Sequence, residues 1–113
     1  MTRFLNLHPE PFLAIKEGRK KIEMRLYDEE KSKIQIGDEI EFKNERTKEI
    51  IKCEVIDIRI YPSFKELYEA LNKEDLGYLP NQKASSEDML KYYPLERQQK
   101  YSVMAIFIRL CNY

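Results

Sequence analysis

The chain has few of the residues that most often build catalytic or metal sites. Its 113 residues include a single histidine, His8, and two cysteines, Cys53 and Cys111. The cysteines lie far apart and in no paired-thiol motif, so both are expected to be small, reduced residues of the interior. Three soft ligands at unrelated spacings do not form the pattern of a structural zinc site. We therefore expect no metal and no cofactor.

The sequence also lacks the motifs of the commonest hydrolases and nucleoside triphosphatases. It contains neither a Gly-x-Ser-x-Gly nucleophile elbow nor a phosphate-binding P-loop. An enzyme built on this chain would have to work with Lys, Glu, Asp, Tyr or Arg side chains.

An excess of one charge and a long apolar run are absent as well. The 20 basic and 20 acidic residues cancel, which excludes a histone-like protein and an acidic disordered tail. The longest unbroken apolar run, residues 103–108, is far shorter than the roughly 20 residues that cross a bilayer. The first ten residues have no extended apolar core and no small-residue cleavage site. We expect a soluble, cytoplasmic protein that makes no membrane contact.

What the chain does contain is enough for one packed core. Hydrophobic residues make up 42% of it, and eight tyrosines with five phenylalanines argue against disorder. No repeat or linker divides the sequence, so residues 1–113 are predicted to form a single domain.

Hydrophobic periodicity predicts mostly short strands. Period-two alternation indicates strands over residues 4–8, 22–26 and 39–42, and a longer one over 50–60 with a bulge near Asp57. Residues 102–110 are apolar on both faces, which is typical of a strand in the middle of a sheet. The strand residues expected to share one core are Ile22, Met24, Val103, Ala105 and Phe107.

Helix signals are fewer and shorter. Pro11 to Gly18 predicts about two helical turns, and Ser63 with Glu66 forms a capping box in which the serine oxygen accepts from an early helical N–H. A further helix is expected from Ser85 or Ser86 to Pro94. The mixed order predicts an α+β domain, a small curled sheet or barrel with short helices at its ends.

A cluster of basic residues lies where the first helix passes into the second strand. Two acids, Glu17 and Glu23, stand among five basic residues, which are Lys16, Arg19, Lys20, Lys21 and Arg25. Backbone N–H groups and side chains can converge on an anion at such a turn. A solvated charged turn is the alternative.

The residues around this cluster resemble the ASCH domain, the activating-signal-cointegrator homology domain. The resemblance is carried by the string Pro11-Phe12-x-x-Ile15-x-x-Gly18-x-Lys20-x-x-Glu23-x-Arg25 and by Ile36-Gly37-Asp38-x-Ile40-x-Phe42. Tyr61-x-x-Phe64, Tyr92-Tyr93-Pro94 and the strand that follows Tyr101 extend it from about residue 3 to about residue 110. It implies a PUA-like mixed β-barrel with peripheral short helices.

The resemblance also implies a basic cleft that binds RNA or a nucleotide, with a role in RNA metabolism, transcription or translation. Lys20 and Arg25 can neutralise phosphates, and tyrosines can stack an exposed base, although each tyrosine can equally pack into the core with its hydroxyl at the surface. The residues expected to bind are Gly18, Arg19, Lys20, Lys21, Glu23, Arg25, Tyr61 and Tyr93. Tyr92 and Tyr101 are further stacking candidates.

Two other functions stay open. One branch of small bacterial ASCH proteins acts as an amidohydrolase on acetylated cytidine nucleosides, with a lysine, a threonine three residues later and a distal glutamate. The resemblance places Lys20 at the lysine, but Glu23 at the threonine and the distal glutamate near Glu74. The alternative is therefore an amidohydrolase with Lys20 as base and Glu23 as its partner. The other is a protein-interaction module that takes a peptide or an acidic tail.

Electrostatics gives Lys20 and Glu23 two possible roles. The cations Arg19, Lys21 and Arg25 would depress the pKa of Lys20, while Glu23 would oppose that shift. A simpler interpretation than catalysis is a Lys20–Glu23–Arg25 polar network in the cleft, used for binding or only for structure. Against a catalytic trio we favour at this point a plain surface ion pair of Glu23 and Arg25, worth at most about 1 kcal/mol.

Overall fold

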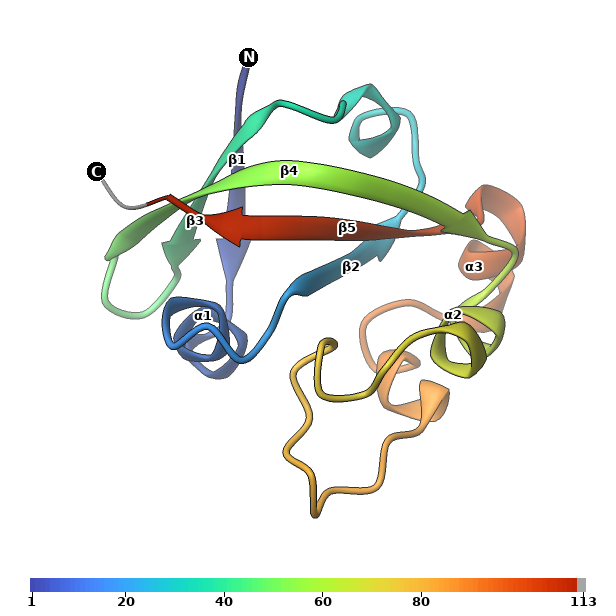
Figure 1. The fold of residues 1–113 in the computed structure, drawn as a ribbon. Coiled ribbons are helices and arrows are strands. Elements are labelled where there is room, and N and C mark those ends of the chain that lie inside the picture. The colour runs from blue at the N-terminus through green and yellow to red at the C-terminus, as the bar shows by residue number, and fades with distance from the viewer. Residues whose placement is uncertain (112–113) are drawn as a thin grey trace.

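Five strands form one strongly curled sheet in the computed structural model, which describes residues 1–111 (Figure 1). Its order is β1-β3-β4-β5-β2, and the strands are β1 (Thr2–Leu7), β2 (Ile22–Leu26), β3 (Glu39–Asn44), β4 (Ile50–Tyr61) and β5 (Val103–Leu110). β1 runs parallel to β3, and the other neighbours are antiparallel. The two edge strands β1 and β2 do not pair, so the sheet is a half-barrel. The predicted α+β, barrel-like architecture is confirmed.

β5 is the central strand that its sequence predicts. It pairs with β4 on one side and β2 on the other, and the predicted bulge appears as a register shift between Val55 and Asp57. Val103 and Ala105 pack into one apolar cluster with Ile22 and Met24, and Phe107 packs against it. The alternate residues of β5 enter a second cluster beneath β1, β3 and α1. Each large apolar side chain buried in this way contributes about 1.5–3 kcal/mol.

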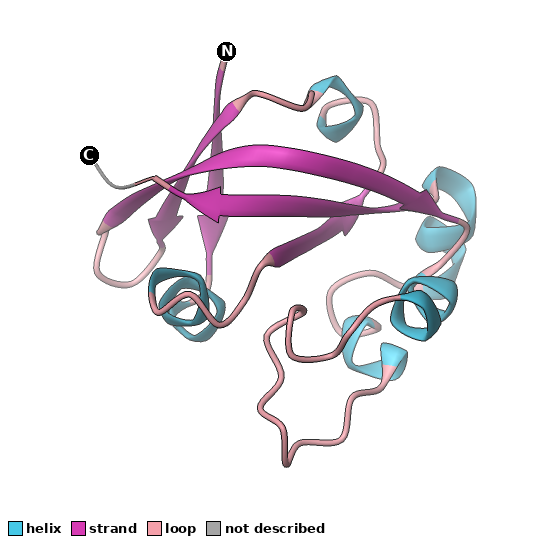
Figure 2. Cartoon of the chain, in the orientation of Figure 1, coloured by secondary structure: helices cyan, strands magenta, loops and turns pink. Residues whose placement is uncertain are grey.

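Three short helices lie beside the sheet, and Figure 2 shows the long loop that follows the second of them. They are α1 (Pro9–Lys16), α2 (Phe64–Ala70) and α3 (Leu95–Tyr101), with 3-10 turns at η1 (Lys31–Lys33) and η2 (Ser86–Met89). Within residues 1–111, no helix has the length and apolar character needed to cross a membrane.

The helix predicted from Ser85 or Ser86 to Pro94 is wrong. Ser85 does cap a helical turn, because its side chain accepts from the Glu87 N–H at 3.2 Å. That turn is only η2, and α3 begins after Pro94, whose backbone is extended at ψ 153°. A proline disfavours helix in the residue before it and suits the start of the next helix, so the chain divides here.

The predicted capping box at Ser63 is wrong in its bonding, although α2 begins where it indicates. Ser63 makes no side-chain bond to the helix backbone, and its hydroxyl donates to the Glu66 carboxylate instead. The Phe64 N–H donates to Oε1 of Gln98 at 3.1 Å, and Gln98 Nε2 donates to the Tyr93 carbonyl at 2.9 Å. Gln98 is buried, so this amide joins α2, α3 and the Tyr93 backbone.

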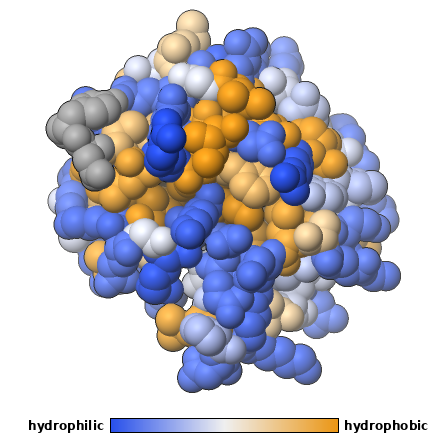
Figure 3. Space-filling model, in the orientation of Figure 1, coloured by the Kyte–Doolittle hydropathy of each residue, from blue (hydrophilic) through white to orange (hydrophobic). Residues whose placement is uncertain are grey.

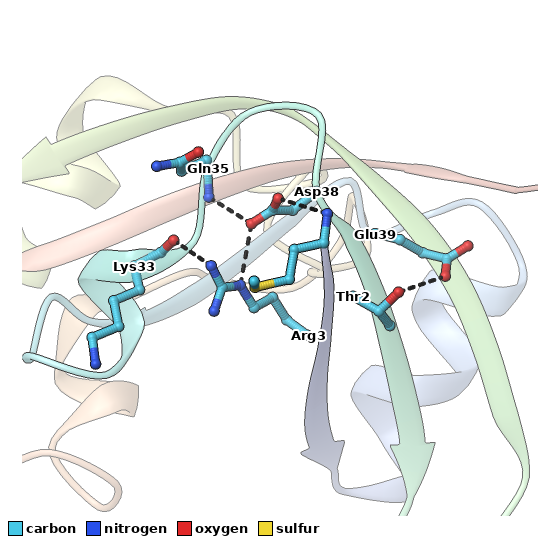
Figure 4. Close-up of polar contacts among 7 residues, drawn as sticks. Thr2, Arg3, Lys33, Gln35, Asp38 and Glu39 are labelled. Atoms are coloured by element: carbon cyan, nitrogen blue, oxygen red, sulfur yellow. Dashed lines mark hydrogen bonds and ion pairs between the residues drawn. The ribbon is translucent and has the colours of Figure 1, made fainter.

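A buried carboxylate fixes the start of β3 (Figure 4). Asp38 accepts from Arg3 Nε at 3.2 Å, from the Gln35 N–H at 2.9 Å and from the Met1 amino group at 3.4 Å. Burial would raise the pKa of Asp38, but these donors outweigh it and hold the pKa below its ordinary value. The Asp38 cluster thus joins β1 to the turn before β3.

The outer face of β4 and β5 carries apolar side chains. Figure 3 shows hydrophobic residues gathered over these strands, and Ile56 and Ile60 of β4 are 47% and 44% exposed. Arg59 points to the other side of β4 from Ile60, because neighbouring residues of a strand face opposite ways, and its guanidinium carbon lies 4.7 Å from the ring centre of Phe107. The charged residues around Lys20 lie instead in the wall of a cavity.

Candidate functional site

A cavity of about 700 Å³ opens beside α1 and β2. Most of its wall comes from three parts of the chain: the end of β1 with α1, the turn into β2 with β2 itself, and the segment from Leu76 to Tyr93. Glu45 and Tyr68 complete it. The long loop after α2 therefore closes a space that the sheet alone would leave open.

Lys20 reaches this cavity because the backbone on both sides of it is fixed. Gly18 ends α1 with a φ of +81°, in the left-handed region that glycine adopts most readily. The Lys20 N–H then donates to the Ala14 carbonyl at 3.0 Å. The N–H groups of Lys21 and Ile22 both donate to the Asp75 carbonyl, at 2.8 and 3.0 Å, so the loop after α2 holds the start of β2.

The Lys20 side chain is buried, with 6% of the residue exposed. Its Nζ donates to the Leu76 carbonyl at 3.1 Å and lies 3.4 Å from Oε1 of Glu23. Gly77 packs on its aliphatic stem: a Cβ at Gly77 would lie 3.3 Å from Cδ of Lys20, and the φ of +112° also favours glycine. A larger residue at 77 would therefore push the lysine out of place.

Glu23 joins two cations. Its Oε2 accepts from Arg25 Nε at 2.7 Å, and Arg25 Nη2 donates to the Asn6 carbonyl at 2.9 Å. Glu23 is 5% exposed. The interpretation of Glu23 and Arg25 as a surface ion pair is therefore wrong: the carboxylate is buried and shared with Lys20. Lys20, on one side of the carboxylate, is covered by Leu76 and Gly77, and Arg25, on the other, is tied to the Asn6 carbonyl.

Burial dominates the electrostatics of Lys20, Glu23 and Arg25, the charged trio of this cavity. Burial lowers the pKa of Lys20, Glu23 opposes that shift as expected, and Arg25 adds a smaller lowering. The main cause is thus desolvation rather than the neighbouring cations that the sequence suggested. Burial would raise the pKa of Glu23, but the charges of Arg25 and Lys20 outweigh it and keep the carboxylate ionised.

Aromatic residues form the wall that faces the trio. Tyr68, Tyr78, Tyr92 and Tyr93 all line the cavity. The ring of His8 lies 5.8 Å from that of Tyr92, and its Nδ1 contacts the Glu45 carboxylate. Burial raises the pKa of Tyr93, so its hydroxyl stays protonated near Arg25. The cavity thus combines a buried charged side with an aromatic side.

The family model of the ASCH domain matches residues 5–108. This chain belongs to the ASCH domain family. The sequence is 39% identical to that of the hypothetical protein PH0355, whose crystal structure matches this one with a TM-score of 0.84. The match covers 98% of this chain and 100% of that chain. The solution structure of protein PF0455 from Pyrococcus furiosus is 38% identical, with a TM-score of 0.71 over 100% of both chains.

More distant ASCH proteins share the fold alone. The crystal structure of ASCH from Zymomonas mobilis is 18% identical, with a TM-score of 0.65 over 96% of this chain and 66% of that one. No curated protein matches the sequence. The resemblance seen in the sequence and the PUA-like fold that it implies are therefore confirmed.

Only some of the residues predicted to bind a ligand line the cavity beside α1 and β2. Arg19, Lys20, Glu23, Arg25 and Tyr93 line it. Gly18 and Lys21 instead line a separate pocket of about 390 Å³ with Ile56 and Ile108. Tyr61 and Tyr101 pack against the apolar cluster around Phe64, and Glu74 is absent from the cavity wall. Tyr61 and Tyr101 therefore pack in the core, as the alternative to base stacking has it, and Glu74 lies outside the cavity.

The lining is not basic, contrary to the expectation. It has four cations, Arg19, Lys20, Arg25 and Lys91, and five carboxylates, Glu10, Glu17, Glu23, Glu45 and Asp88, besides His8. The signs are separated, however. Two of the cations are in the trio with Glu23, and four of the carboxylates lie outside it. Net charge along the sequence could not show this division.

Several cavity residues were not singled out from the sequence. Tyr68 fitted the apolar stripe of a helix, Tyr78 lay in an irregular stretch, and Asp88 lay in the helix predicted from Ser85 or Ser86 to Pro94. No local pattern in the sequence connects the three. Within residues 1–111, no cluster of three His, Cys, Asp or Glu side chains could hold a metal ion.

Proposed function

We propose that this ASCH domain binds a single nucleotide in the cavity, either free or as an exposed nucleotide of an RNA strand. The observation that carries the proposal is the sharing of one buried carboxylate, Glu23, by two cations, Lys20 and Arg25. A role in RNA metabolism, transcription or translation would follow if the nucleotide belongs to RNA.

The trio is suited to one anionic group. Two positive charges against one negative charge leave one positive charge in excess, in a place where water screens it poorly. Lys20 has three N–H donors, two of which point to Leu76 and Glu23. Its remaining donor, with those left on Arg25, can bind a phosphate oxygen through charge-assisted hydrogen bonds.

The aromatic side is suited to the base. Tyr92 is 45% exposed and has His8 beside it. The Nζ of the exposed Lys91 lies 5.0 Å from its ring centre, and a base that stacks on Tyr92 would take the place of this flexible side chain. Stacking of a base on an aromatic side chain is worth about 1–3 kcal/mol and tolerates any base.

The carboxylates outside the trio favour one nucleotide over a long strand. Glu10, Glu17, Glu45 and Asp88 line the same cavity, and each would repel further phosphates. They would repel an acidic peptide as well, so the interaction-module alternative has little support.

Hydrolysis of acetylated cytidine also has less support in the geometry. The oxygens of Glu23 face Lys20 and Arg25, and these cations lower the pKa of Glu23, which makes it a weaker base for activating a water. Glu74 does not line the cavity. A nucleoside of that kind would fit the proposed site as a ligand.

The proposal is tested by calorimetric titration of the protein with a nucleoside monophosphate and with the matching nucleoside. We expect the monophosphate to bind about tenfold more tightly at about 50 mM salt, and this advantage to shrink at about 200 mM because salt weakens phosphate contacts. A trinucleotide should bind no more than a few-fold more tightly than the monophosphate. Equal binding of nucleoside and monophosphate, or no binding of either, would contradict the proposal.

A further inference from the structure

Three polar side chains form a hydrogen-bonded chain on the cavity wall. The Tyr78 hydroxyl donates to Oδ2 of Asp88 at 2.6 Å, and the hydroxyls of Tyr68 and Tyr78 lie 2.9 Å apart. Both tyrosines are half-buried and line the cavity. Their rings meet edge to face with centres 6.0 Å apart, so the two hydroxyls are held in place.

The number of hydroxyl hydrogens decides which group donates in each of these hydrogen bonds. A tyrosine hydroxyl has one hydrogen to donate, and an ionised carboxylate has none. The hydrogen of Tyr78 is used at Asp88. Tyr68 must therefore donate its own hydrogen to the oxygen of Tyr78, because the reverse would leave Tyr78 and Asp88 as two acceptors in contact. Burial and the hydrogen bonds to Asp88 and Tyr68 raise the pKa of Tyr78, which keeps its hydrogen in place.

The result is an oxygen at Tyr68 that can only accept. Its hydrogen points to Tyr78, and its lone pairs are available to a ligand in the cavity. Tyr68 and Tyr92 line the same cavity. Burial raises the pKa of Tyr68 against the opposing effect of its bond to Tyr78, so its hydroxyl stays protonated. The acceptor therefore shares the cavity with the ring proposed to stack the base.

We infer that Tyr68 reads the base of the bound nucleotide and selects one that presents an exocyclic amino group, against one that presents a carbonyl at that place. The inference rests on the proposed nucleotide site and names the ligand class for it. Tyr78 and Asp88 are positioning residues, since they act on the ligand only by fixing the hydrogen of Tyr68.

Selection between bases is expected because an oxygen that only accepts pairs with an amino group and not with a carbonyl. An amino group opposite Tyr68 gains a hydrogen bond, whereas a carbonyl there meets a second acceptor and loses its bond to water. A site with a fixed polar group rejects a ligand that cannot pair with it. Adenosine monophosphate has an amino group at C6 where inosine monophosphate has a carbonyl, and cytidine and uridine monophosphates differ in the same way at C4. In each pair the adjacent ring nitrogen carries a hydrogen only in the carbonyl member.

The experiment measures the dissociation constants of these four monophosphates for the wild type, Tyr68→Phe and Tyr78→Phe. We expect the wild type to bind the amino member of at least one pair about tenfold more tightly. Tyr68→Phe should remove the preference by weakening the amino ligand. Tyr78→Phe frees the hydrogen of Tyr68, which can then donate to a carbonyl, so the preference should vanish because the carbonyl ligand binds more tightly.

Tyr27→Phe is the control, because Tyr27 does not line the cavity and should keep the wild-type ratios. A gain for the carbonyl ligand in Tyr78→Phe is an effect that loss of structure cannot produce. If the wild type binds all four equally, or if Tyr78→Phe weakens all four by one factor, the inference is wrong while the nucleotide site stands. If the wild type binds none of them, the proposed function and the inference both fail.

Discussion

Replacing Glu23 by alanine is expected to lower the free energy of unfolding by about 3 kcal/mol or more. The substitution removes the one carboxylate between Lys20 and Arg25 and leaves the buried Lys20 beside the half-buried Arg25 with no negative charge between them. Their repulsion is poorly screened, because Lys20 is 6% exposed and the loop after α2 covers it. Denaturant unfolding followed by circular dichroism measures the change.

Two further variants separate the trio from a general loss of charge. Glu54 makes an ion pair with Arg109 at the surface, so Glu54→Ala should cost less than about 1 kcal/mol. In the double variant Glu23→Ala with Lys20→Met, one of the two cations is also gone, and we expect it to be more stable than Glu23→Ala alone. A cost for Glu23→Ala no larger than that for Glu54→Ala would contradict the description of a buried network.

Replacing Lys20 by methionine is expected to weaken the binding of a nucleoside monophosphate about 10- to 100-fold, since hydrogen bonds to charged groups contribute about 1.5–3 kcal/mol. Methionine preserves much of the aliphatic stem that packs on Gly77, so the cavity should keep its shape. The matching nucleoside lacks the phosphate and should bind as it does to the wild type.

Lys21→Met is the matched control. It removes the same charge one residue further along, where the side chain lies outside the cavity. We expect its affinity to stay within about twofold of the wild type. Equal losses in the two variants would mean that the phosphate contact depends on overall charge and not on the trio.

The sequence predicts the central strand and its core well, because local pattern decides them. Residues 102–110 alternate between two apolar clusters, and their apolar character on both faces is visible without any structure. The neighbourhood of Glu23 and Arg25 is predictable for the same reason, since residues two apart in a strand share a face. The burial of the trio is not predictable, because it depends on segments distant in the sequence. The turn at Asp75 and Leu76 holds Lys20 and the start of β2, and Asn6 of β1 holds Arg25.

The aromatic side of the cavity could not be predicted in the same way. Tyr68 and Tyr78 meet through a loop without periodicity, and Asp88 joins them from η2. The division of the last helical region has a clearer physical origin. Pro94 offers both an end to one turn and a start to the next, and the pattern of apolar residues favoured only the end.

Nucleotide binding in the cavity is tested most directly by an amide and arginine side-chain NMR titration with a nucleoside monophosphate. We expect the Nε–H signal of Arg25 and the amide signals of Lys20, Gly77 and Tyr92 to move together and saturate with one affinity. Signals from the Asp38 cluster, which joins β1 to β3, should stay in place. Saturable shifts confined to the pocket around Ile56 and Ile108, or weak shifts scattered over exposed lysines, would contradict nucleotide binding in the cavity.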